Sequence, residues 1–402
     1  MKLQIGRKLS ANSLMLSLLS VMFIYATLTF VRLQYSFYVA VAAYAGFYLL
    51  SVHLKFRWNL NNRTTIWFIV SAFVSSLYII NGEIERVTLY LSCIIYIFFW
   101  SNAFHFLAIN FSIHTLRKYC VFNLSVLLVS VIATLRVLSM YPLASRAIYG
   151  RADGLTDTAF LFPMGCGGFG FIYGFVFITI GLIAIIKSKE ANDKLRLFCF
   201  LYLILSYSLI LKAQFSTAIV LSISIILLFA ISRSEHYLVG YIAIALAGLI
   251  AFFMLDEILN LLSKLADSMG ISLLTGKVSM ITSAIYTKNY NSLSRVQVYI
   301  KSIEGFMSNP VFGSGVSGEH SQIIDTFSSI GLFAVPFVGL ILSCIRSFER
   351  YIPKKYILVL KIIVVISAAL NPFVDMTLLS IAFMLCPCLI YCSLPYTKRG
   401  EI

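Results

Sequence analysis

Charged residues are scarce in this sequence. Of its 402 residues, 12% are charged and 60% are hydrophobic, whereas soluble domains carry about 25% charged residues. A soluble globule of this length needs a polar exterior, so the shortage of charge excludes an ordinary water-soluble fold. A lipid bilayer removes that requirement, because its hydrocarbon core accepts an apolar outer surface.

Acidic residues are the scarcer of the two charge types, and the formal net charge is +15. No basic stripe with interleaved aromatic residues lies outside the apolar blocks, so no nucleic-acid partner is expected. Lysine and arginine instead gather in the segments that face the cytoplasm if the N-terminus is inside. The positive-inside rule therefore predicts that both termini are cytoplasmic and that these cations lie beside anionic lipid headgroups.

Metal and cofactor motifs are also missing. The eight cysteines form no C-x-x-C pair, no histidine stands near them at ligand spacing, and no Asp-x-Asp motif is present. The stretch Gly313-x-Gly-x-x-Gly318 matches the dinucleotide-binding pattern, but no strand precedes it and no βαβ unit surrounds it. We therefore expect buried, inert cysteines, no metal and no cofactor.

Long apolar blocks are what the sequence does contain. Blocks of about 18 or more apolar residues are candidate membrane-spanning helices, whereas a β-barrel would show short alternating segments. The sequence predicts a polytopic, all-α integral membrane protein with a single membrane domain. About twelve spans are expected, near 13–31, 35–53, 65–81, 87–109, 119–140, 165–186, 195–212, 214–231, 237–255, 323–343, 356–370 and 375–395.

Two long connections are external in this layout, residues 141–164 and 256–322. The second is far longer than a helix–helix connection needs. Apolar residues recur at helical spacing from Asp256 to Ala266 and from Leu293 to Met307, and Asn309-Pro310 stops the second helix. The longer loop is therefore expected to be partly helical.

The longer loop has an arginine at the head of its second helix, a Pro-x-x-Gly-x-Gly turn and a histidine, and an apolar segment with a Gly-Leu pair follows it. These residues are Arg295, Pro310, Gly313, Gly315, His320 and Gly331-Leu332. In this order of motifs the chain resembles the superfamily of O-antigen polymerases and ligases, whose members share them in and after a late external loop. The run His320-Ser321-x-x-x-Asp325 is similar to the polymerase (Wzy) branch, whereas the ligase branch more often has His-Asn.

Other parts of the chain extend the resemblance. The stretch Gly150-Arg151-Ala-Asp-Gly154 is similar to an earlier external arginine loop of the family, and Asn371-Pro372 and Pro387 are similar to the polymerase branch. The family often has Ser-Arg where this chain has Ser216-Thr217, and Lys212 is a candidate to replace that charge. The resemblance implies a GT-C-like membrane glycosyltransferase of the bacterial inner membrane, with its active site on the periplasmic side.

The chemistry follows from the residue types. A glycan linked to lipid pyrophosphate leaves behind a pyrophosphate anion, and arginine binds phosphate oxygens bidentately without losing its proton. Arg151 and Arg295 are therefore expected to clamp the leaving group, and His320 to accept the proton of the attacking sugar hydroxyl. The resemblance implies an undecaprenyl-pyrophosphate-linked oligosaccharide as the substrate, and a flippase and a chain-length regulator of the same pathway as partners.

Each candidate also has a simpler interpretation. Arg151 and Arg295 are also explained as loop charges, His320 as a solvated loop residue, and Lys212 as a snorkelling lysine at a helix end. Glu319 and Asp325 either cap the following helix or belong to the active site. Gly313 and Gly315 are interpreted as a flexible turn that carries His320 over the substrate. His53, His105, His114 and His236 are expected to be structural or interfacial.

Three functions compete. The leading one is a metal-independent, inverting polymerase that joins lipid-linked repeats. The first alternative is the ligase that moves the finished glycan to lipid A-core, which would use the same pyrophosphate site. The second is a flippase or transporter, which predicts paired interrupted helices and ionisable residues at mid-membrane depth. The sequence shows neither feature and concentrates its distinctive residues in one external loop.

Overall fold

The computed structural model describes residues 2–28, 36–56, 62–148, 161, 163–231, 294–316, 321–371 and 375–394, with the single residues 264, 268, 276 and 279. This part of the chain consists of helices, turns and short connections and has no β-strand, so the all-α expectation is confirmed for it. The expected span at 237–255 and most of the stretch 256–266 lie outside the described residues.

The chain divides into two compact units, each held together by contacts of its own. The main unit comprises Met1–Leu209, Val335–Lys361 and Phe373–Ile402, and the loop unit comprises Ile210–Ala334 and Ile362–Pro372. Two helices, α8 and α16, begin in the main unit and end in the loop unit.

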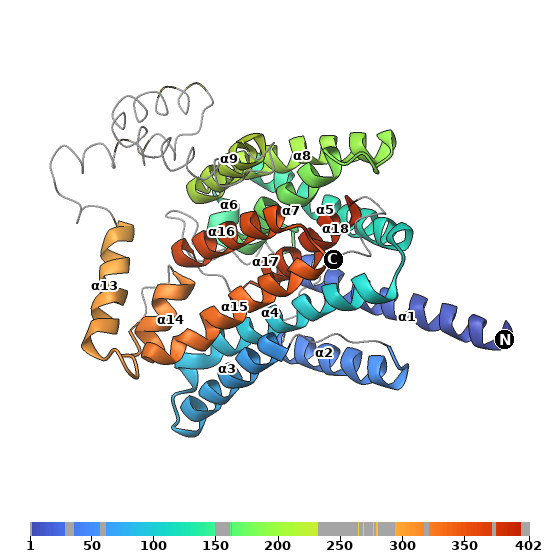
Figure 1. Cartoon of the computed structure of the whole chain (residues 1–402). Coiled ribbons are helices and arrows are strands. Elements are labelled where there is room, and N and C mark those ends of the chain that lie inside the picture. Colours follow the sequence, from blue (N-terminus) through green and yellow to red (C-terminus); the bar gives the residue numbers. More distant parts are fainter. Residues whose placement is uncertain are drawn as a thin grey trace. The chain divides into compact units, whose positions relative to one another are not determined.

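The described helices follow one another along the chain as Figure 1 labels them. They are α1 (Lys2–Thr27), α2 (Ser36–His53), α3 (Asn62–Ile80), α4 (Ile84–Asn110), α5 (Ile113–Met140), α6 (Ala144–Ala147), α7 (Phe169–Ile186), α8 (Asp193–Ala213), α9 (Ser216–Ile231), α13 (Ser294–Ser308), α14 (Gln322–Ile330), the 3₁₀ helix η4 (Gly331–Ala334), α15 (Val335–Ser347), the 3₁₀ helix η5 (Phe348–Arg350), α16 (Lys354–Leu370), α17 (Met376–Ser380), the π-helix η6 (Ile381–Leu385) and α18 (Cys386–Cys392).

Helix α7 is the centre of the main unit. Of its span, 94% is buried, compared with 28% for α3 and for the span of α8. On α3, Ile66, Ile69 and Phe73 are 57–62% exposed, which is costly in water and acceptable against lipid tails. The main unit therefore has an apolar exterior around an apolar centre, as expected of a helix bundle in a bilayer.

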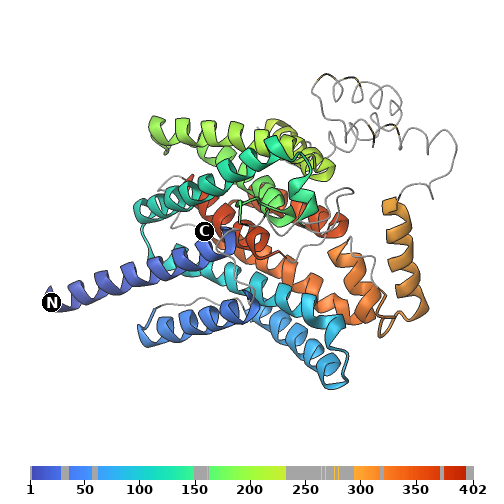
Figure 2. The ribbon, with the colours of Figure 1, turned by 180° about the vertical axis from the view of Figure 1, so that it is seen from behind.

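A row of glycines lets α7 approach the last helices of the chain closely (Figures 1 and 2). A Cβ added to Gly174 would lie 2.6 Å from Ile381 Cδ1, and one added to Gly181 would lie 2.6 Å from Leu389 Cβ. Without a hydrophobic driving force inside lipid, helices associate by such close backbone approach. We call this contact between α7 and α17, η6 and α18 the glycine seam.

Six described helical runs are long and apolar enough to cross a membrane. They are Asn62–Ile80, Tyr90–Asn110, Ile113–Met140, Phe169–Ile186, Asp193–Ala213 and Gln322–Arg350. Shorter apolar helices cover Ser13–Thr27, Ser216–Phe229 and Met376–Cys392. These helices support the membrane character of the chain, and a total of twelve spans stays a prediction.

Several helices begin or end where hydropathy does not predict. The expected helix at 13–31 begins at Lys2 and ends at Thr27. The helix expected from 119 begins at Ile113, because the Ser112 hydroxyl accepts a hydrogen bond from the Thr115 N–H (3.3 Å) and caps it. The helix expected from 165 begins at Phe169, because Gly165 takes a φ of +76°. The helix expected from 214 begins at Ser216, after Gln214 at a φ of +56°.

Two expected helices are interrupted. The run at 323–343 breaks at Gly331, which has a φ of +62° and ends α14, so the Gly-Leu pair does not lie inside a continuous α-helix. The run at 375–395 contains the π-helix η6 before Pro387. Proline has no N–H to donate to the preceding turn, which is why a widened turn is tolerated there.

We predict that Gly181→Ala weakens the glycine seam. The new methyl group must displace Leu389, and overpacking of this kind costs about 1–3 kcal/mol. Thermal unfolding of the detergent-purified chain measures the loss. The matched control is Gly46→Ala in α2, which meets no atom within 4 Å and is expected to be neutral or stabilising by up to about 1 kcal/mol. Equal effects of the two substitutions would contradict the seam.

Candidate functional site

The start of α14, in the loop unit, is capped by two side chains of the same segment, those of Ser321 and Asp325. The Ser321 hydroxyl accepts a hydrogen bond from the Ile324 N–H (3.1 Å), and Asp325 Oδ2 accepts one from the Ser321 N–H (2.9 Å). This reciprocal pair resembles a capping box with the acid one residue further along. The carboxylate also complements the positive end of the helix. Asp325 therefore caps the helix, as the simpler interpretation of the sequence predicts.

Helix α13 lies beside α14 (Figures 1 and 2), and a polar contact and an aromatic one hold the two helices together. Ser302 donates a hydrogen bond to Asp325 Oδ1 (2.6 Å), and Ser302 is fully buried. One turn further, the rings of Phe306 and Phe327 meet edge to face with 5.8 Å between centroids. Asp325 thus links the start of α14 to the middle of α13.

The carboxyl end of α16 completes the same junction. The last carbonyls of a helix have no partner within the helix. Here residues of α13 and of the start of α14 donate hydrogen bonds to them. Tyr299 Oη donates to Leu370 O (3.0 Å), the Gln322 N–H donates to Asn371 O (3.0 Å), and the Ser321 hydroxyl lies 3.5 Å from Ala368 O. We call this meeting of α13, the start of α14 and the end of α16 the loop junction.

The Pro-x-x-Gly-x-Gly turn packs on the far end of α14. The Ser314 N–H donates to Ser328 O, and the Leu332 N–H donates to Pro310 O, both at 2.8 Å. Gly313 has a φ of +74°, and a Cβ there would lie 2.3 Å from Ser329 O. Gly313 is therefore needed for a left-handed conformation and close backbone approach. The described part of the turn is therefore hydrogen-bonded, whereas residues 317–320 lie outside the described residues, and a flexible turn that carries His320 stays a prediction.

The structure describes some of the site residues expected from the sequence and leaves others undescribed. Arg295 belongs to α13, four residues before Tyr299, so it falls on the helix face that carries Tyr299 and Ser302. Gly315 is half-buried with a φ of +74°, and Lys212 is exposed in the last turn of α8. Arg151, Glu319 and His320 lie outside the described residues, as does the side chain of Arg295.

The structure brings together residues that follow two of these candidates in the chain. Ser321 directly follows His320 and is fixed by the loop junction, and Tyr299, one turn after Arg295, is fixed at the same place. Sequence reasoning missed Tyr299 and Ser302. Their spacing of four and seven residues from Arg295 is the signal that marks one face of a helix.

A carboxylate in the main unit was also missed. Asp375 caps α17 by accepting hydrogen bonds from the N–H groups of Thr377 (2.8 Å) and Leu378 (3.2 Å). A Cβ added to Gly170 would lie 2.0 Å from Asp375 Cγ, so this carboxylate also lies against the first turn of α7. Asp375 therefore sits at the start of two buried helices, where a negative charge is favoured. An aspartate before an apolar run is a readable cap signal.

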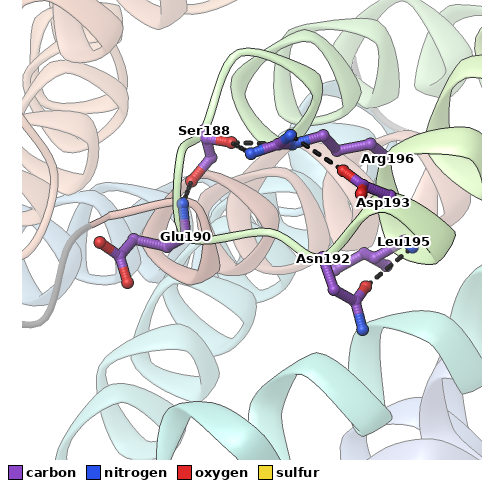
Figure 3. A network of polar contacts seen from close by, with 6 residues as sticks. All are labelled: Ser188, Glu190, Asn192, Asp193, Leu195 and Arg196. Carbon is purple, nitrogen blue, oxygen red and sulfur yellow. Dashed lines mark hydrogen bonds and ion pairs between the residues drawn. The ribbon is translucent and has the colours of Figure 1, made fainter.

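At the end of the main unit expected to be cytoplasmic, arginines bind helix-end carbonyls. Figure 3 shows Arg196 donating to Ser188 O through Nε (3.1 Å) and Nη2 (2.8 Å), while Nη1 pairs with Asp193 at 3.1 Å. The guanidinium of Arg117 likewise donates to Cys392 O at 3.2 and 3.0 Å. The Ser188 hydroxyl donates to Ser393 O. These cations were expected to face lipid headgroups, yet they help to close the bundle.

No group of three or more potential metal ligands occurs among the described residues. All eight cysteines are buried and free, in agreement with their interpretation as small apolar side chains. His105 is 4% exposed, and its Nε2 lies 2.7 Å from Ser347 Oγ, which fits a structural role. No protein-family model and no curated protein matches the chain.

We predict that Gly313→Ala loosens the turn from α14. The substitution forces a left-handed alanine, which costs about 1–2 kcal/mol, and meets backbone at 2.3 Å. Phe312 is 59% exposed, so chymotrypsin cleavage after Phe312 should become roughly tenfold faster. Val311→Ala, in the same turn and 48% exposed, is the control and should leave the cleavage rate unchanged. Unchanged cleavage of the Gly313 variant would contradict the docked turn.

Proposed function

We propose that the chain is a membrane glycosyltransferase that joins polyprenyl-pyrophosphate-linked oligosaccharide repeats at the periplasmic face of the bacterial inner membrane. The observation that carries the proposal is the loop junction. It holds the helix of Arg295 and the residue that follows His320 against the end of α16. The two candidate residues thus stand in the chain beside residues that the junction holds together, which supports a shared site.

In the proposed reaction, a sugar hydroxyl of one lipid-linked repeat attacks the anomeric carbon of the growing chain. The bond from that carbon to the pyrophosphate oxygen breaks, and the configuration inverts. Arg295 and Arg151 stabilise the charge that develops on the pyrophosphate, because their forked donors match its oxygens. His320 takes the hydroxyl proton. Lys212, exposed in the last turn of α8, adds positive potential.

Asp325, Gly313 and Gly315 have a different role in this proposed reaction from the arginines and His320. Asp325 caps α14 and binds Ser302, so it sets where the chain leaves toward His320 without touching the substrate. Such preorganisation matters because misplacement of a catalytic group by about 1 Å reduces rates on the order of a hundredfold. Gly313 and Gly315 are proposed to shape the nearby surface for the glycan, in addition to their backbone roles.

We predict that Arg295→Ala abolishes chain extension, because an uncompensated pyrophosphate charge raises the barrier by several kcal/mol. The measurement is the surface-polysaccharide ladder of a strain that lacks the gene and carries the variant. Arg295→Lys should also fail, since a point charge cannot replace the bidentate fork. The matched control is Lys301→Ala, an exposed cation on the same helix, which should restore the ladder. A full ladder from Arg295→Ala would remove this residue from the mechanism.

We predict that His320→Ala reduces polymer by a factor on the order of 10² to 10⁴, the usual contribution of a general base. The same strain without any complementing gene separates the competing functions. Core bearing one repeat indicates a polymerase, and bare core with accumulated lipid-linked polymer indicates a ligase. Bare core with only single lipid-linked repeats indicates a flippase, and an unchanged ladder would refute all three.

A further inference from the structure

The turn between α15 and α16, in the main unit, presents four basic side chains. Arg346, Arg350, Lys354 and Lys355 are exposed, and we call them the basic turn. The turn contains one acid, Glu349, whose carboxylate accepts a hydrogen bond from Lys361 Nζ at 3.0 Å. Four like charges within ten residues repel one another, so the arrangement calls for an anion from outside the turn.

The backbone of the basic turn is held in place by apolar anchors. Phe348 and Ile352 are completely buried, and the N–H groups of Tyr351 and Ile352 both donate to Phe348 O, at 2.8 and 2.9 Å. The Phe348 ring meets Phe104 edge to face at 4.9 Å. Because buried and exposed residues are interleaved here, the anchors fix the backbone that carries the four cations.

Some of the other basic residues at the end expected to be cytoplasmic have partners in the protein. Arg117 and Arg196 donate to the protein's own carbonyls, and Lys361 pairs with Glu349. Lys189 and Lys194 are exposed, but two exposed acids, Glu190 and Asp193, stand beside them in the chain. The basic turn is thus the denser group of positive charge.

The position of the turn selects the kind of anion. Arg346 and Arg350 lie at the end of the candidate span Gln322–Arg350, and Lys354 and Lys355 follow it, so a span that crosses a bilayer would bring all four to its headgroup region. Tyr351 and Tyr356 lie in the same turn, with Lys355 Nζ 5.0 Å from the centre of the Tyr356 ring. Tyrosine and lysine together are typical of the membrane interface.

We propose that the basic turn is a binding site for an anionic phospholipid, whose headgroup phosphate is held by Arg346 and Arg350 from α15 and η5 and by Lys354 and Lys355 from the start of α16. The arginines donate paired hydrogen bonds to the phosphate oxygens, and the lysines add positive charge close to them. The site is independent of glycosyl transfer and lies in a different unit from the loop junction.

The test uses the full chain purified in detergent, with phosphatidylglycerol and phosphatidylcholine as probes and native mass spectrometry as the readout. The unmodified chain should retain more phosphatidylglycerol than phosphatidylcholine. Arg350→Gln with Lys355→Gln should weaken phosphatidylglycerol retention roughly twentyfold, because each basic residue contributes about fivefold at such a surface, and should leave phosphatidylcholine retention unchanged.

The matched control removes two other exposed cations, Lys189→Gln with Lys194→Gln, and should change retention by less than about twofold. Equal weakening by both pairs would mean a diffuse surface potential and would overturn the site, as would no weakening by either.

A second measurement needs no variant. Vesicles of phosphatidylglycerol, compared with phosphatidylcholine, should protect Lys354 and Lys355 from acetylation more than Lys189 and Lys194, and equal protection would also overturn the site.

Discussion

The end of each helix in this chain must find hydrogen-bond partners where water is scarce, and much of the described structure depends on that requirement. An unpaired backbone carbonyl in an apolar setting costs several kcal/mol. In the main unit, Arg117 and Arg196 bind the carbonyls of Cys392 and Ser188. In the loop unit, the end of α16 is satisfied by Tyr299 and by the start of α14. These helix ends are thereby paired within each unit.

This requirement connects the fold to the candidate site. The loop 256–322 has 67 residues, and it would lose much conformational entropy if it had to be ordered for catalysis alone. Part of that ordering is already achieved when α13 and the start of α14 complete the end of α16. Ser302 and Asp325 then fix α13 and α14 to each other. A site built on this junction starts from backbone that is already positioned in α13 and at the start of α14.

Hydropathy predicted most of the described helices, but it predicted neither of the two interruptions within them. The ranges 35–53, 65–81, 87–109, 195–212 and 356–370 match helices to within three residues, because an apolar block long enough to span has few alternatives to a helix. The breaks at Gly331 and at η6 were missed, since they depend on tertiary contacts such as the Leu332 N–H on Pro310 O. Asp325 was correctly offered as a cap, but its bond to Ser302 required knowledge of which helices are neighbours.

The two uses of arginine explain why counting arginines does not locate a pyrophosphate site. A guanidinium is as well suited to a helix-end carbonyl as to a phosphate oxygen, and Arg117 and Arg196 have taken the first role. In the loop junction, the carbonyls of Leu370 and Asn371 already receive donors from Tyr299 and the Gln322 N–H. These two carbonyls are therefore capped without an arginine. Which of the two groups a guanidinium binds depends on the donors already present around it, and a count of arginines does not include them.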